Sequence, residues 1–275
     1  HQWNGATQWS LPKAETARLA VPGLFGYRMD SPPEQRYWGS VGQTPGWPEH
    51  RMGMPHHSGY GVYAGVLVLV VAVWGLVNSF RREDGPYSRV ECRFIWFTAT
   101  LAIISLGLAW GRHGFLYQLI YPLPFFNDIR NPIKFMQPFS LLLVILFGLG
   151  LQGIARLYLE DTRRRVKEAG SMLSNLFQPG EGFEKTWAIG SGVFFMAAAA
   201  LSLALMTLQG DVAVHISRGL GLADEQGAKA MAAFGMGQIW RTLLLLLMAL
   251  LLLLAVPRLR WSPKGVVGLW AALGI

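Results

Sequence analysis

The fold of this chain is decided by residues 112–135, which read RHGFLYQLIYPLPFFNDIRNPIKF. Two prolines interrupt an apolar run, and a polar cluster follows it directly. The apolar part, residues 115–126, has 12 residues. At about 1.5 Å per helical residue it is too short to cross a hydrocarbon core of about 30 Å. We therefore predict a re-entrant or interfacial segment that enters a membrane without crossing it.

The polar cluster after this segment is the candidate ligand-binding site. Arg130 and Lys134 return the chain to water just before a long apolar run. A guanidinium group gives a phosphate paired hydrogen bonds, and an ammonium group gives it a mobile charge. Both residues fit equally well as anchors at the level of the lipid headgroups. The candidate substrate-binding residues are Arg130, Lys134, Asp128, Asn131, Arg112 and His113.

The roles of the other groups near this segment stay open. Asp128 could pair with Arg130, which would leave Lys134 or Arg112 free for a ligand. His113 suits a proton-transfer group or a phosphate donor, and it equally suits a helix-end histidine bonded to nearby carbonyl groups. The sequence contains no nucleophile elbow, phosphate-cradling glycine loop or zinc-binding helix. The catalytic residues therefore stay unknown from the sequence, and we expect no metal and no cofactor.

The composition is typical of a membrane protein. Of the 275 residues, 52% are hydrophobic and only 15% are charged. The net charge of +8 does not indicate nucleic-acid binding, because the basic residues lie between apolar runs. The single cysteine, Cys92, excludes a disulfide framework. The chain begins at His1 without a signal segment and ends at Ile275 within an apolar run, so we expect a fragment of a longer protein.

The chain divides into a soluble-looking region and a membrane region. Residues 1–58 are rich in Trp, Pro and Gly, with too little periodic apolar content to fold alone. They predict a long loop packed on a membrane domain, residues 59–275. Apolar runs near the roughly 17–25 residues needed to cross a bilayer predict the spans. These are residues 59–80, 94–110, 139–155, 187–208 and 239–256, with a sixth, 265–275, truncated by the chain end.

The distribution of Lys and Arg predicts the orientation. The segments 80–93, 156–186 and 257–265 hold 13 of these residues, whereas 111–138 and 209–238 hold 5 in a similar total length. Loops rich in Lys and Arg face the cytoplasm. This alternation requires that residues 115–126 do not span. The predicted fold is therefore an all-α polytopic membrane bundle with a long extracytoplasmic loop and a re-entrant or interfacial segment.

Three short motifs resemble the YfhO-type bacterial membrane proteins. The first is LPKAE at 11–15, leading to VPGLFG at 21–26. The second is YWG at 37–39 followed by YGVYAG at 60–65, and the third is FFNDIRNPIKF at 125–135. The resemblance covers residues 8–155. This family in turn resembles the polytopic glycosyltransferases of the GT-C superfamily.

The resemblance implies a glycosyltransferase in the bacterial inner membrane. Such an enzyme moves a sugar from a polyprenyl-phosphate carrier to an extracytoplasmic acceptor, so the implied partners are membrane lipid and a lipid-linked sugar donor. The catalytic acid of the superfamily is expected upstream of His1. Arg130 and Lys134 are then the candidates for the contact with the carrier phosphate. A transporter or flippase for a lipid-linked or anionic solute, and a non-catalytic membrane scaffold, are the alternatives.

Overall fold

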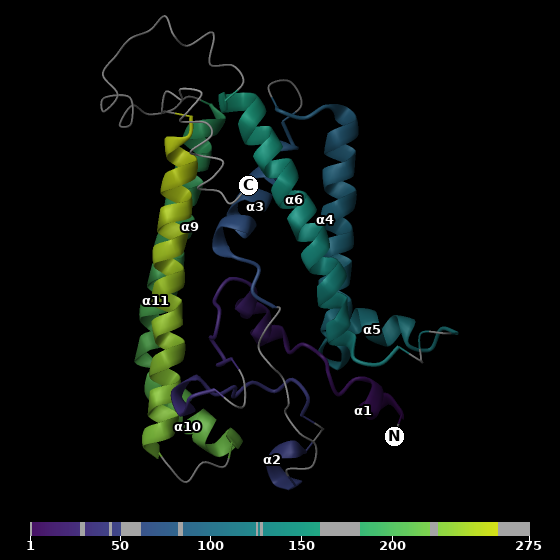
Figure 1. Cartoon of the computed structure of the whole chain (residues 1–275), viewed down its shortest axis with the longest axis vertical. Coiled ribbons are helices and arrows are strands. Elements are labelled where there is room, and N and C mark those ends of the chain that lie inside the picture. Colours follow the sequence, from purple (N-terminus) through teal and green to yellow (C-terminus); the bar gives the residue numbers. More distant parts are fainter. Residues whose placement is uncertain are drawn as a thin grey trace, which may run out of the picture.

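The computed structural model describes residues 2–27, 31–43, 46–50, 62–81, 85–124, 126, 129–159, 182–220 and 225–257 (Figure 1). All regular elements in these ranges are helical, which confirms the predicted all-α class. The longer helices are α3 (Val66–Asn78), α4 (Arg89–Ala109), α6 (Met136–Ile154), α9 (Phe183–Thr207), α10 (Gln209–Leu220) and α11 (Glu225–Ala255). The shorter elements are α1 (Gln2–Ala6), η1 (Lys13–Leu19), η2 (Pro33–Gln35), α2 (Trp47–His50), η3 (Gly111–His113), α5 (Phe115–Ile120), η5 (Pro132–Phe135) and η6 (Ala155–Leu159).

Within the described residues, four helices are long and apolar enough to cross a membrane. They are α4, α9, α11 and the continuous stretch Pro132–Tyr158, which contains α6. In Figure 1 they run along the long axis of the molecule, with α4 beside α6 on one side and α9 beside α11 on the other. By their length and composition, these helices agree with the expected helical membrane protein.

A further apolar helix of the bundle, α3, is shorter than the predicted span 59–80. It has 13 residues, or about 20 Å of helix, which is less than the thickness of a bilayer core. The residues before it are not helical, and the hydrogen bond from Ala64 N to Leu19 O at 3.0 Å ties them to η1. Residues 59–61 and the predicted span 265–275 lie outside the described residues.

The end of the bundle that carries residues 80–93 is fixed by a helix cap and an ion pair. Ser88 and Glu91 form a capping box at the start of α4. Arg156, just after α6, reaches Glu91 Oε1 at 2.9 Å and the Pro86 carbonyl at 3.1 Å. The Tyr87 hydroxyl also donates to Leu149 O at 2.9 Å. These contacts hold α4 and α6 together at this end.

Helices α3 and α6 pack at two glycines. A Cβ atom added to Gly75 would lie 2.8 Å from Gly150 Cα, and one added to Gly150 would lie 2.4 Å from Val71 O. Both distances are too short for real atoms, so the two backbones approach closely only because these residues are glycines. Small residues allow this kind of close packing between membrane helices.

Replacing Gly150 by leucine is therefore expected to separate α3 from α6 and destabilise the bundle by about 1–3 kcal/mol or more, as overpacking does in tight cores. Gly148 is the matched control, because a Cβ added there meets nothing within 4 Å on the same helix. The measurement is the thermal unfolding midpoint of each variant in detergent. Equal midpoints for Gly150→Leu and Gly148→Leu would contradict the close packing.

The N-terminal region lies at the opposite end of the bundle from the Arg156 cluster. Figure 1 shows α1, α2, α5 and α10 together at this end. Thr242 Oγ1, on α11, donates to Ala20 O at 3.4 Å, and the rings of Tyr27 and Phe234 lie 5.8 Å apart. The sequence predicts that residues 1–58, 111–138 and 209–238 share the extracytoplasmic side, and the described parts of these three regions lie at one end of the helices. That this end faces away from the cytoplasm stays a prediction.

Candidate functional site

The candidate site is organised by residues 6–11, which lie between the end of α4 and the start of α6. Leu11 N donates to Ala109 O at 2.9 Å on one side. On the other side, Ile133 N donates to Trp9 O at 2.9 Å and Asn131 N donates to Ala6 O at 3.0 Å. This segment connects the two halves of the predicted site, which are separated by the 115–126 segment in the sequence.

A glycine brings these backbones together. Gly111 has φ +49°, and a Cβ added there would clash with Ser10 Oγ and lie 2.8 Å from Pro132 Cγ. The Ser10 hydroxyl accepts from Arg112 N at 3.1 Å and donates to Thr7 O at 2.6 Å. The turn after α4 is therefore held in one conformation, which determines where the Arg112 side chain begins.

Arg112 lies in a partly buried position that leaves one nitrogen without a partner. Its Nη2 donates to Gln43 O at 2.7 Å and its Nε donates to His113 Nε2 at 3.4 Å. Its Nη1 is buried and has no hydrogen-bond partner in the part of the chain that the structure describes. An unpaired buried donor is unfavourable, and an anion would satisfy it.

Lys13 and His113 complete a basic cluster with Arg112. Lys13 Nζ lies 5.7 Å from the centre of the Trp110 ring, and the Trp110 indole donates to Thr16 Oγ1 at 2.9 Å. No carboxylate among the described residues lies within 4.0 Å of the three basic side chains. We call Lys13, Arg112 and His113 the basic cluster.

The electrostatics of the basic cluster favour an anion. Burial lowers the pKa of His113 below its usual value, and the charges of Arg112 and Lys13 lower it further. Burial also lowers the pKa of Arg112. A neutral His113 can accept the hydrogen bond from Arg112, which agrees with the observed contact. Each of these pKa shifts would be opposed by a bound negative charge.

The other predicted site residues lie beyond residues 6–11, towards α6. The side chains of Arg130 and Lys134 are exposed, and no ion pair within the described ranges involves either of them. Asn131 adopts a left-handed conformation with φ +65°, which starts the turn before Pro132. Asp128 lies outside the described residues. The predicted pairing of Asp128 with Arg130 stays a prediction.

The segment predicted to be re-entrant contains the short helix α5. Figure 1 shows α5 extending sideways from the ends of α4 and α6. Tyr117 is fully buried and its hydroxyl donates to Ile129 O, whereas Phe115 and Leu119 are 67% and 65% exposed. One face of α5 thus packs on the protein, and apolar side chains project from another. A helix with exposed apolar residues at positions i and i+4 suits the membrane interface.

A buried polar network lies beside the basic cluster, and the sequence did not predict it. Glu15 is 1% exposed and accepts hydrogen bonds from Arg18 at 2.9 Å, Tyr37 at 2.7 and 2.9 Å, and Ser40 N at 2.8 Å. Burial and the Glu15 charge raise the pKa of Tyr37, so its hydroxyl keeps its proton and donates. A Cβ added to Gly39 would clash with this network.

Glu15 is the only buried carboxylate in the described ranges, but it is unsuited to act as a base. Both of its carboxylate oxygens already accept hydrogen bonds from neighbouring groups, so neither is free to take up a proton from a substrate. With Arg18, Tyr37 and Ser40 as donors, Glu15 has a structural role. The residues LPKAE and YWG, which are 22 positions apart at Glu15 and Tyr37, meet in this network. Each motif contains one partner of this hydrogen bond, but only the fold shows that the two residues meet.

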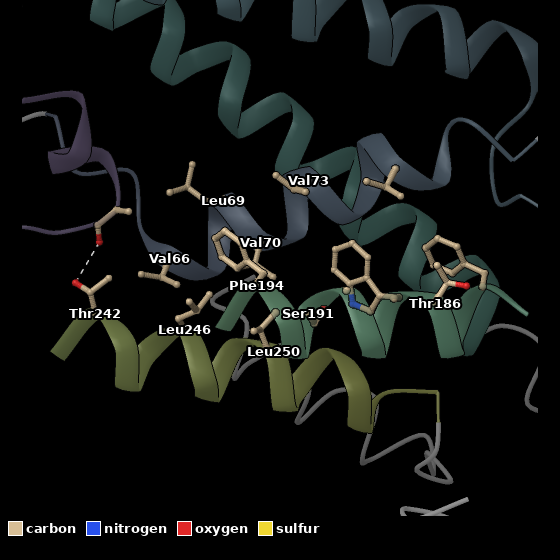
Figure 2. Close-up of a pocket in the computed structure, with 15 residues that line it drawn as sticks. Val66, Leu69, Val70, Val73, Thr186, Ser191, Phe194, Thr242, Leu246 and Leu250 are labelled. Carbon is tan, nitrogen blue, oxygen red and sulfur yellow. Dashed lines mark hydrogen bonds between the residues drawn. The ribbon is translucent and has the colours of Figure 1, made fainter. Parts of the chain in front are cut away.

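The bundle also contains an apolar groove of about 470 Å³ between α3, α9 and α11. Figure 2 shows Val66, Val70 and Val73 on α3 facing Phe194 on α9 and Leu246 on α11. The lining is almost entirely apolar, and its polar contact at one end is the hydrogen bond from Thr242 to Ala20. None of the three residues of the basic cluster lines the groove.

Comparison with known proteins adds no relative. No family model matches the chain, and neither the curated proteins nor the solved structures give a match. Among the described residues, no three His, Cys, Asp or Glu side chains are grouped so that they could hold a metal ion. The functional argument therefore depends on the geometry of the site itself.

Proposed function

We propose that this chain is part of an integral membrane glycosyltransferase that moves a sugar from a polyprenyl-phosphate carrier to an extracytoplasmic acceptor. The observation that carries the proposal is the basic cluster. Lys13, Arg112 and His113 gather at the end of a membrane-length helix, and no described carboxylate lies within 4.0 Å of them. Arg112 Nη1 is buried and has no partner among the described residues. A phosphate at the membrane surface fits these charges.

In the proposed sugar transfer, negative charge develops on the departing carrier phosphate. The acceptor hydroxyl oxygen attacks the anomeric carbon of the sugar and loses its proton to a base. The bond between that carbon and the carrier phosphate oxygen breaks, and the electron pair stays on the phosphate. Fixed cations that contact the departing phosphate stabilise this charge, which is the largest contribution in many enzymes. Arg112 supplies the fixed cation, Lys13 adds a second positive charge beside it, and the base lies outside the described site.

The basic cluster suits this role better than Arg130 and Lys134 do. Arg112 is held at its backbone by Ser10 and at its guanidinium group by Gln43, so little conformational freedom is lost when it binds an anion. Arg130 and Lys134 are exposed and free to rotate. They lie at the other edge of residues 6–11, where they can attract the charged donor to the surface.

The location of the site relative to the membrane supports a lipid-linked donor. The exposed Phe115 and Leu119 suit α5 to a position at the membrane interface, and α5 directly follows the basic cluster in the chain. The loops at the opposite end are richer in Lys and Arg, which favours a cytoplasmic location for that end. The phosphate of a lipid carrier in the outer leaflet would then lie at the depth of Arg112.

Binding of a prenyl phosphosugar is expected to tighten as the pH falls through the range in which His113 titrates. The free cluster lowers the pKa of His113, whereas a bound phosphodiester raises it, so binding takes up a proton. The phosphodiester itself does not titrate in this range. The affinity therefore increases by up to about tenfold per pH unit between the pKa of His113 in the complex and its lower pKa in the free site, and it levels off below the latter.

The measurement is the dissociation constant of a short-chain prenyl phosphosugar for the chain in lipid nanodiscs between pH 5 and 8. His113→Gln should remove the pH dependence. His215 on α10 provides the control, since His215→Gln leaves the basic cluster intact. If the pH dependence persists in His113→Gln, or if the wild-type chain does not bind the phosphosugar, the proposal fails. Binding together with movement of the donor across the bilayer, without transfer, would instead identify a flippase.

A further inference from the structure

The groove between α3, α9 and α11 opens towards the bilayer. Two of its lining residues, Val73 and Phe194, are 50% and 60% exposed. Helix α9 buries only Ser191 and Ser202 among its residues, so most of its surface is available to lipid. A groove with an apolar wall of this kind accepts hydrocarbon and excludes polar groups.

The length of the groove fits one leaflet of a membrane. Its wall follows α3 from Val66 to Val77, which corresponds to about 16 Å of helix. Half of a bilayer core of about 30 Å is nearly the same length. The groove can therefore hold one acyl chain of an ordinary membrane lipid along its length, and it is short for the chain of a polyprenyl carrier.

The two ends of the groove differ in their polar groups. At the Thr242 end, the hydroxyl already donates to Ala20 O. At the other end, Trp187 Nε1 is buried and has no partner among the described residues. Phe183, which also lines the groove, stacks on Trp187 with ring centres 6.2 Å apart. The guanidinium carbon of Arg81 lies 4.7 Å from the centre of the Phe183 ring. The Trp187 end of the groove therefore has a hydrogen-bond donor without a described partner and a nearby cation, and the Thr242 end has neither.

We infer that this groove binds one acyl chain of an anionic phospholipid whose phosphate or ester oxygens lie at Trp187 and Arg81. The indole N–H donates to a lipid oxygen, and the guanidinium group balances the phosphate charge. The lipid belongs to the leaflet on the Arg81 side, at the opposite end of the bundle from the basic cluster. This site does not depend on the proposed glycosyltransferase activity.

The test is native mass spectrometry of the chain released from nanodiscs that contain equal amounts of phosphatidylglycerol and phosphatidylcholine. Gly190→Leu fills the groove, because Gly190 lines it and an added Cβ meets nothing within 4 Å. Gly192→Leu is the matched control on the same helix, with equally open space but outside the lining. We expect bound phosphatidylglycerol in the wild type and in Gly192→Leu, and its loss in Gly190→Leu.

Two further variants test the headgroup end. Trp187→Phe removes the indole N–H donor and keeps an aromatic side chain. Arg81→Gln removes the positive charge. Arg81→Gln is expected to reduce the preference for phosphatidylglycerol by about fivefold, as for one charge near an anionic headgroup. Arg89→Gln, an exposed arginine at the same end, should leave it unchanged. Equal lipid occupancy in Gly190→Leu and Gly192→Leu, or a prenyl phosphate displacing the phospholipid from the groove, would overturn the inference. Circular dichroism confirms that each variant is folded.

Discussion

Glu15→Ala is expected to destabilise the N-terminal region by about 3–5 kcal/mol, because it leaves Arg18 as an uncompensated buried charge. Both side chains are 2% exposed in their ion pair. The substitution also removes the acceptor for the Tyr37 hydroxyl and for Ser40 N. Arg18 Nη2 already lacks a partner among the described residues, so no other group there can replace the carboxylate. We expect this variant to lose the packing of η1 against residues 37–41.

The measurement for Glu15→Ala is the thermal unfolding midpoint in detergent, together with limited proteolysis of residues 2–43. Glu49→Ala is the control, because Glu49 is exposed and its loss should change the stability by less than about 0.5 kcal/mol. Tyr37→Phe should have an intermediate effect, since it removes one donor and keeps the charge pair. A midpoint for Glu15→Ala equal to that of Glu49→Ala would show that the network does not stabilise the fold.

Arg112→Gln is expected to weaken binding of a prenyl phosphosugar by about 10- to 150-fold, the effect of losing a charged hydrogen bond of about 1.5–3 kcal/mol. Glutamine keeps much of the side-chain volume and loses the positive charge. The backbone hydrogen bond from Arg112 N to Ser10 does not involve the side chain, so the turn after α4 should persist. Lys13→Gln should have a smaller effect, because Lys13 is exposed.

The control for Arg112→Gln is Arg93→Gln, which removes an exposed arginine near the other end of α4. Isothermal titration with the same phosphosugar measures both variants. Arg130→Gln tests the other half of the site, and we expect a weaker effect there because solvent screens the exposed charge. If Arg130→Gln lowers the affinity more than Arg112→Gln does, the phosphate lies on the other side of residues 6–11.

The long helices could be predicted from the sequence, because membrane spans require long apolar runs. The predicted spans 94–110 and 139–155 each end one residue after the observed helices α4 and α6. Helix α11 begins at Glu225, well before the predicted residue 239, because residues 225–238 continue the helix beyond the apolar run. Helix α3 is shorter than predicted, because Gly65 has φ +95° and the hydrogen bond from Ala64 N to Leu19 O ties the preceding residues to η1.

The candidate site was predicted only in part. Arg112 and His113 were selected because charged residues flank a short apolar segment. Lys13 could not be added from the sequence, since only the fold brings η1 to the end of α4. The pairing of Glu15 with Tyr37 has the same cause: the two residues are far apart in the chain and meet through turns that no local pattern specifies.

The most direct test of the central claim is to locate the phosphate by cross-linking. A prenyl phosphosugar with a photoreactive group next to its phosphate is bound to the chain in nanodiscs and irradiated, and peptide mass spectrometry maps the adducts. We predict adducts within residues 8–16 and 110–114, which surround the basic cluster, and their loss in Arg112→Gln. Adducts confined to residues 129–135, or spread evenly over the membrane helices, would contradict the assignment of Lys13, Arg112 and His113 as the phosphate site.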